Sequence, residues 1–196
     1  TVTNDSRLII GGANTLPANY TTHVIGLESN IEYQGNTTTV AALNSGQSYG
    51  NLIISGSAVT TTNDFAIGGT LSVSGALTAN SGNIIMSNQL SAITNNGTLI
   101  FNNLLIDVTP QNQEQYNTSF SVNGNFEISS GVAFIPTGGT ITMAGGAGQI
   151  INSGGTLTFE GLNITGTIGS SGNFNADASI LVSGSFNPNA SSVIGG

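Results

Sequence analysis

Short runs of alternating apolar and polar residues recur along the whole chain. Residues 120–123 and 140–143 are two examples in which every second residue is apolar. A period of two is typical of a β-strand with one face in a core and the other in water. The runs end at Gly, Asn or Ser, and no segment shows the capped apolar spacing of a helix. We therefore predict an all-β protein with almost no helix.

The runs also form a longer repeat, which is built from three motifs in a fixed order. The first motif, aromatic-x-x-Leu-x-Ile, occurs three times at intervals of roughly 55 residues, and a period of this order is typical of stacked supersecondary units. The motif occurs at Tyr49/Leu52/Ile54, Phe101/Leu104/Ile106 and Phe159/Leu162/Ile164; the other two begin at Phe65, Phe120 and Ile180, and at Ile31, Ile84 and Ile141.

These strands predict a right-handed parallel β-helix, a solenoid with roughly two coils per ~55-residue repeat and roughly 27 residues per coil. Inward Ile, Val, Leu and Phe would stack in columns, with Tyr49, Phe101 and Phe159 at equivalent positions. We expect an asparagine ladder at the corners, made of Asn44, Asn95 and Asn152. Residues 31–196 would form this β-helix as a fragment of a longer chain, and residues 1–30 an irregular first coil or cap.

The repeat varies in length after its first motif. The second motif follows most closely after Ile54, begins later after Ile106 and begins later still after Ile164. A solenoid tolerates insertions only where a loop leaves the stack. Residues 109–117 are the most polar stretch, so we expect them to project from one edge. Tyr116 in this loop is either an ordinary loop aromatic or a platform for a sugar.

Composition narrows the function. Charged residues are 5% of the chain, the net charge is −8, Arg7 is the sole arginine and there is no lysine. Nucleic acid is excluded as a partner because phosphate binding needs clustered cations, and anionic membrane surfaces are disfavoured for the same reason. The absence of cysteine excludes disulfides and thiolate metal sites. No apolar run approaches the ~18 residues of a membrane-spanning helix.

Candidate chemistry is sparse. Catalytic carboxylates work in pairs, and of the nine scattered acids Asp107 and Glu160 are the two that equivalent repeat positions could bring together. Solvated strand ends are the favoured reading for them, and His23 and Arg7 are isolated. The Gly-rich nonapeptide that binds Ca²⁺ between coils is absent. We expect no catalytic, cofactor or metal site, and no enzyme activity. Rows of outward threonines (60–62, 140/142 and 156/158) suit ordered water, but the uneven period disfavours an ice-binding array.

Three stretches, residues 48–57, 60–62 and 69–75, carry a resemblance to a known group. They resemble the β-helical repeats of large secreted surface proteins and adhesins of gliding bacteria, from about residue 30 onward. The resemblance implies an exported, elongated protein at the cell surface, and carries over no binding residues. We therefore expect a structural or adhesive module that forms a homo-oligomer or filament and contacts a cell-surface glycan or a protein receptor. A carbohydrate-binding or carbohydrate-cleaving β-helix and a phage tail-spike segment are the alternatives.

Overall fold

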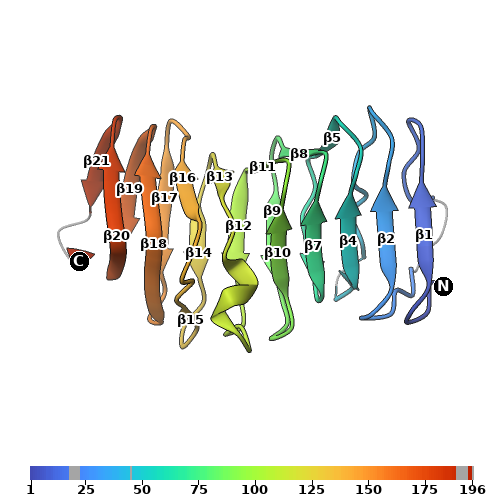
Figure 1. The fold of residues 1–196 in the computed structure, drawn as a ribbon, viewed down its shortest axis with the longest axis horizontal. Helices are drawn as coiled ribbons and strands as arrows, with labels where there is room; N and C mark the ends of the chain where they lie inside the picture. The colour runs from blue at the N-terminus through green and yellow to red at the C-terminus, as the bar shows by residue number, and fades with distance from the viewer. Residues whose placement is uncertain (18–22, 45, 189–193, 196) are drawn as a thin grey trace.

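The chain winds into a rod of stacked β-strand coils, with the two termini at opposite ends of the long axis (Figure 1). This computed structural model describes residues 1–17, 23–44, 46–188 and 194–195. Every strand pair in the described chain is parallel, and helix is limited there to a single 3₁₀ turn. The prediction of an all-β parallel β-helix is confirmed.

Three sheets run along the axis and form the faces of the rod. Sheet 1 occupies the N-terminal part and contains β1 (Arg7–Ile10), β2 (Asn30–Tyr33), β4 (Asn51–Ile54), β7 (Thr70–Val73) and β10 (Ala92–Asn95). Sheet 2 contains β5 (Val59–Thr61), β8 (Ala76–Ala79), β11 (Thr98–Phe101), β13 (Phe120–Val122), β16 (Thr140–Met143), β18 (Thr156–Ile164), β20 (Phe174–Val182) and β22 (Ile194–Gly195), and β15 (Ala133–Phe134) pairs with β18.

Sheet 3 extends along nearly the whole rod. It contains β3 (Ser48–Tyr49), β6 (Phe65–Ile67), β9 (Asn83–Met86), β12 (Asn103–Ile106), β14 (Phe126–Ile128), β17 (Gly148–Asn152), β19 (Thr167–Ser171) and β21 (Ser185–Pro188).

Each coil contains fewer residues than the sequence motifs predicted. The register pairs Val59 of β5 with Leu77 of β8, and Phe126 of β14 with Ile150 of β17. Steps of this kind correspond to roughly 20 residues per coil, at the lower end of the range for solenoid repeats. The coils are short because their corners contain few residues; for example, only Ser74 and Gly75 separate β7 from β8. The sequence repeat therefore spans more than two coils.

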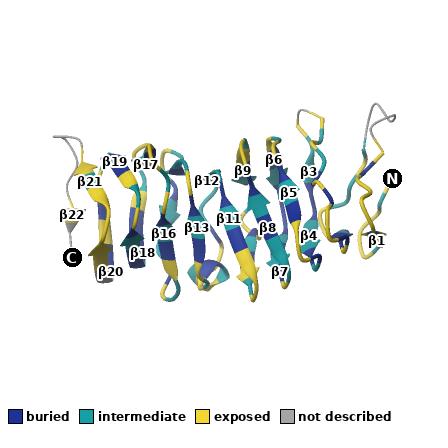
Figure 2. Ribbon diagram, turned by 90° about the horizontal axis from the view of Figure 1, so that it is seen from above, coloured by how far each residue is buried: buried dark blue, intermediate teal, exposed yellow. Residues whose placement is uncertain are grey.

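Alternating side chains form the core. In β4, β7, β8 and β12 the second and fourth residues are buried, whereas the first and third keep partial exposure. The buried positions follow the inner wall of the rod along its length (Figure 2). Each parallel pair places apolar side chains of successive coils in register, as for Leu52 and Leu71. Burying a residue of this size contributes about 1.5–3 kcal/mol.

The repeat of the sequence motifs is not the structural repeat. Tyr49 lies in sheet 3, Phe101 in sheet 2, and Phe159 in the first half of β18, near the residues that pair with β15. The expectation that they occupy equivalent positions is wrong. All three are fully buried, because all faces share one alternation of inward and outward residues. Similar sequence motifs therefore arise on different faces of the rod.

The polar segment expected to project from one edge is built into the stack. Residues Gln113–Tyr116 form the 3₁₀ helix η1, which packs against β10, and Asn112 caps it. Tyr116 is buried, with its ring centroid 5.3 Å from that of Phe134. The side-chain amide of Gln113 takes the place of backbone pairing between strands. It accepts from Ile135 N at 2.8 Å and donates to Ala133 O at 3.2 Å. Tyr116 therefore offers no surface for a sugar.

A tyrosine pair supports the coil between β2 and β3, where sheet 2 is represented by a bridge at Thr39. Tyr49 donates to Ala41 O at 2.8 Å, and Tyr33 accepts from Ala41 N at 3.1 Å. The two hydroxyls are 3.3 Å apart. Burial, with Tyr33 beside it, raises the pKa of Tyr49 far above its usual range, so Tyr49 remains a donor. Irregular backbone is thus satisfied inside the core.

Candidate functional site

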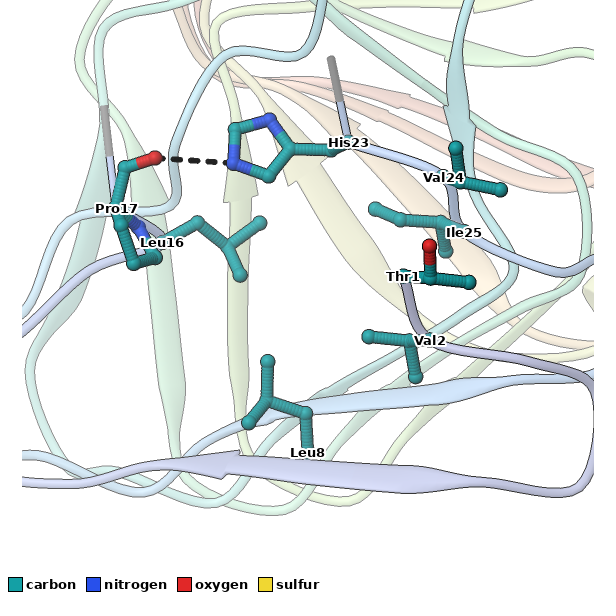
Figure 3. Close-up of a pocket in the computed structure, with 8 residues that line it drawn as sticks. All are labelled: Thr1, Val2, Leu8, Leu16, Pro17, His23, Val24 and Ile25. Atoms are coloured by element: carbon teal, nitrogen blue, oxygen red, sulfur yellow. Dashed lines mark hydrogen bonds between the residues drawn. The ribbon is translucent and has the colours of Figure 1, made fainter. Parts of the chain in front are cut away.

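The N-terminal end of the rod holds an apolar pocket of about 290 Å³ (Figure 3). Leu8, Leu16 and Ile25 point toward its centre, and Val2 lies beside them. His23 lies at the rim, with Nε2 3.0 Å from Pro17 O. The pocket lies beside β1, at the N-terminal end of sheet 1. Among the described residues that line it, His23 is the only one with an imidazole or carboxyl side chain.

Arg7 lies on the outside of sheet 1 and is not simply solvated. Its Nε donates to Glu32 Oε2 at 2.9 Å, its second guanidinium nitrogen also contacts that oxygen, and Ser55 donates to Glu32 Oε1. The Glu32 side chain is 4% exposed, against 55% for Arg7. The Ser55 hydrogen bond, followed by Arg7, lowers the pKa of Glu32 and outweighs the opposing effect of burial.

We expect Glu32 to make stability depend on acid. A lowered folded-state pKa stabilises the fold above the unfolded-state value of about 4.3, and this contribution is lost as pH falls through the folded pKa. Because Arg7 is half exposed, the contribution is about 1 kcal/mol or less. Urea unfolding of the wild type and Glu32→Gln should differ at pH 7 and converge below pH ~4.

The control for this prediction is Glu28→Gln, which changes an exposed carboxyl in the preceding turn. It should leave the unfolding free energy at pH 7 close to that of the wild type. A gap between the wild type and Glu32→Gln that widens toward acid would contradict the assignment.

The two acids that the repeat could have paired are on different faces. Asp107 directly follows β12 in sheet 3, whereas Glu160 lies in β18 where the register with β20 shifts. The structure therefore does not bring these carboxylates together. No group of three or more His, Cys, Asp or Glu side chains suited to a metal ion occurs within the described residues. No helix in the described ranges is long and apolar enough to cross a bilayer.

The predicted corner asparagines do not form a ladder with each other. Asn95 donates to Ser119 O at 2.8 Å and Asn152 donates to Asn173 O at 2.6 Å, so each side chain bonds to the backbone of the next coil. Asn44, Asn95 and Asn152 fail to stack because more than two coils separate each one from the next along the chain.

A different polar ladder crosses the outer surface of sheet 3, and we call it the amide lane. Its side chains come from neighbouring coils, with Asn83 opposite Asn103 in the register. Asn83 Nδ2 donates to Asp64 Oδ1 at 3.2 Å, and Asn103 Nδ2 donates to Asn83 Oδ1 at 3.1 Å. Asn103 Oδ1 then accepts from Asn125 N at 2.7 Å. The recurrence of asparagine at one-coil spacing was the sequence signal for this lane.

An aliphatic lane runs beside the amide lane. The register aligns four aliphatic residues and one glutamate on successive strands: Ala66, Ile85, Leu105, Glu127 and Ile151. All five side chains are half-buried. They point outward, since the residues between them in each strand are buried. Sheet 3 thus presents partly exposed apolar groups next to fixed amides.

A third lane, which we call the hydroxyl lane, borders the aliphatic lane. It contains Asp107, Ser129 and Ser153, which follow β12, β14 and β17. Ser129 donates to Asp107 Oδ1 at 2.6 Å, and the Ser153 hydroxyl lies 3.3 Å from Glu127 Oε1. A groove of about 210 Å³ lies between the amide lane and the aliphatic lane; it is lined by Asn83, Ile85, Asn103, Leu104, Leu105, Asn125 and Glu127.

Sheet 2 carries the hydroxyl-rich surface. An outward column includes Thr60, Thr78, Ser121 and Thr142, and Ile100 interrupts it. Part of the prediction of outward threonine rows is wrong, since Thr61 and Thr158 are buried. Thr61 is two residues after the buried Val59 in β5 and therefore points inward with it. A shallow groove of about 300 Å³ lies over β11, β13 and β16. Its lining has hydroxyls but no acidic or exposed aromatic group.

Searches against protein-family profiles, curated proteins and solved structures find no match to this chain. Sheet 3 is the face that combines ordered amides, carboxylates and apolar side chains in one groove.

Proposed function

We propose that the chain is a non-enzymatic structural and adhesive module of a large extracellular bacterial surface protein. One observation carries the proposal: the parallel ladders of all three sheets run along a single axis. Backbone hydrogen bonds therefore join each coil to the next in the direction of the rod. Such a stack is stiff along its length and presents its outer side chains at a regular strand spacing of about 4.8 Å.

The outer surface supports contact more than catalysis. Outward positions are mainly short hydroxyl, amide and aliphatic groups, and the described carboxylates do not gather in threes. Side chains on the backbone ladder are held in place at little entropic cost to a binding partner. A rigid, weakly charged surface of this kind suits adhesion to another surface.

Self-association is part of the proposal. The first strand exposes Leu8 and Ile9, and the last long strand exposes Ile180, Leu181 and Val182. The first strand of sheet 1, β1, and the last strand of sheet 3, β21, are sheet edges, and open strand edges favour pairing with another strand. A second copy stacked end to end would extend the parallel ladders as a heterologous contact, and such contacts generate filaments.

Beads coated with the folded chain should attach to bacterial cell envelopes at least several-fold more than beads coated with heat-unfolded chain. Electron microscopy of the same preparation should show rods and end-to-end filaments. Equal attachment by folded and unfolded chain would refute the adhesive role. Monodisperse monomers at high concentration would refute the filament.

A further inference from the structure

We infer that the outer face of sheet 3 binds a neutral polysaccharide chain that lies along the rod axis across β9, β12 and β14. This inference rests on the proposed adhesive function, and names the ligand class and the site. The site is the groove between the amide lane and the aliphatic lane, to which Ile85 and Leu105 belong.

The chemistry of the three lanes matches the two kinds of surface on a sugar. A pyranose ring has C–H groups on its faces and hydroxyls around its edge. Ile85 and Leu105 offer partly exposed apolar surface for the C–H groups. Asn103 can bond hydroxyls as donor and acceptor: the ladder engages one of its two N–H groups, and its oxygen has two lone pairs.

The amides are ordered before any ligand arrives. Asn83, Asn103 and Asn125 are linked to neighbouring coils by hydrogen bonds of 2.7–3.2 Å. A binding partner therefore loses little free energy in immobilising them. On the other side of the groove, the hydroxyl of Ser153 orients Glu127, whose carboxylate is a strong acceptor for sugar hydroxyls.

The geometry favours a chain over a compact ligand. Equivalent lane residues recur at the strand spacing of about 4.8 Å, which is close to the length of one sugar unit in an extended glycan. The groove of about 210 Å³ is smaller than the roughly 300 Å³ or more of a typical small-molecule pocket. The amide and aliphatic lanes continue beyond the groove, to Asp64 and Gln149 and to Ala66 and Ile151. Several sugar units can thus occupy successive coils.

Charge selects a neutral glycan. Each of the three lanes carries a carboxylate: Asp64 in the amide lane, Glu127 in the aliphatic lane and Asp107 in the hydroxyl lane. The sole arginine of the chain, Arg7, is on β1 in sheet 1 and is paired with Glu32. Uronic acids and sulfated sugars would meet carboxylates without a compensating cation.

Isothermal titration with soluble neutral polysaccharides (mixed-linkage β-glucan, xyloglucan and β-mannan) tests the inference. The wild type should bind at least one of them. Leu105→Arg, which fills the groove from an outward position, should weaken binding at least tenfold. Asn103→Ser, which removes the amide, should weaken it several-fold. The matched control is Ile100→Arg, an outward aliphatic of the same coil on sheet 2. It should bind as the wild type does.

Thermal unfolding of each variant shows whether it is folded, and Asn103→Ser covers the case in which Leu105→Arg is not. Absence of binding to every polymer, or equal weakening by Leu105→Arg and Ile100→Arg, would overturn the inference. Binding restricted to a cationic glycan such as chitosan and abolished by salt would also overturn it. If coated beads still attach to envelopes without glycan binding, the glycan site fails and the adhesive function stands. If the beads do not attach and no glycan binds, the adhesive function and the glycan site are both refuted.

Discussion

Replacing Gly75 by alanine is expected to lower the free energy of unfolding by about 3 kcal/mol. Gly75 follows β7 at the corner leading to β8, and a methyl group there would overlap the carbonyl of Gly56 in the preceding coil. Ser55 O would also be 2.8 Å away. The obstacle is backbone, so it cannot rotate aside. Urea unfolding followed by circular dichroism measures the loss.

The reason extends beyond one residue, because the glycines form a column. Gly35, Gly56, Gly75 and Gly97 each lie against the carbonyl of the glycine one coil earlier. The matched control is Gly146→Ala, since a methyl group there has no atom within 4 Å. It should change the unfolding free energy by less than about 0.5 kcal/mol. Equal effects from the two alanines would show that the corner can open, and that close stacking does not select glycine.

Truncating Phe126 to alanine is expected to cost about 4 kcal/mol. Its ring is fully buried, and its centroid lies 5.3 Å from that of Phe134 and 5.4 Å from that of Phe159. The truncation leaves a cavity between coils and removes edge contacts worth about 0.5–1.5 kcal/mol each. Chemical denaturation compared with the wild type provides the measurement.

Phe186→Ala provides the same chemical change near the C-terminal end of the rod. Phe186 is only partly buried, and its nearest ring, that of Phe174, is 6.0 Å away between centroids. We expect less than half the loss seen for Phe126→Ala. Similar losses at both positions would indicate that the end of the stack is packed as tightly as its centre.

Alternation and the longer repeat predicted the fold and many of the inward residues, but not Thr61, which is buried. Leu104 and Ile106 were expected inside, and both are buried in β12. The coil length could not be obtained from the same motifs, since alternation is identical on every face. Tyr49 and Phe101 therefore look equivalent in sequence but lie in different sheets. The glycine column recurs once per coil from Gly12 to Gly97, so the spacing of its glycines gives the coil length.

Sequence motifs alone could not predict the candidate site on sheet 3. Asn83, Asn103 and Asn125 are separated by about one coil each, but they stand out only once the coil length is known. Leu105 looked like any strand residue. Its place in the groove depends on the register of β12 with β9 and β14, a non-local pairing that no local pattern specifies.

The 3₁₀ turn η1 has a mechanical consequence. Along the side of sheet 1, side chains of Thr109, Gln113 and Asn117 bond to residues 133–137 in place of a strand ladder. Sheets 2 and 3 continue past this level unbroken. Amide side chains yield to strain more easily than paired backbone. The rod should therefore bend preferentially at this level, with neighbouring coils separating on the side of η1.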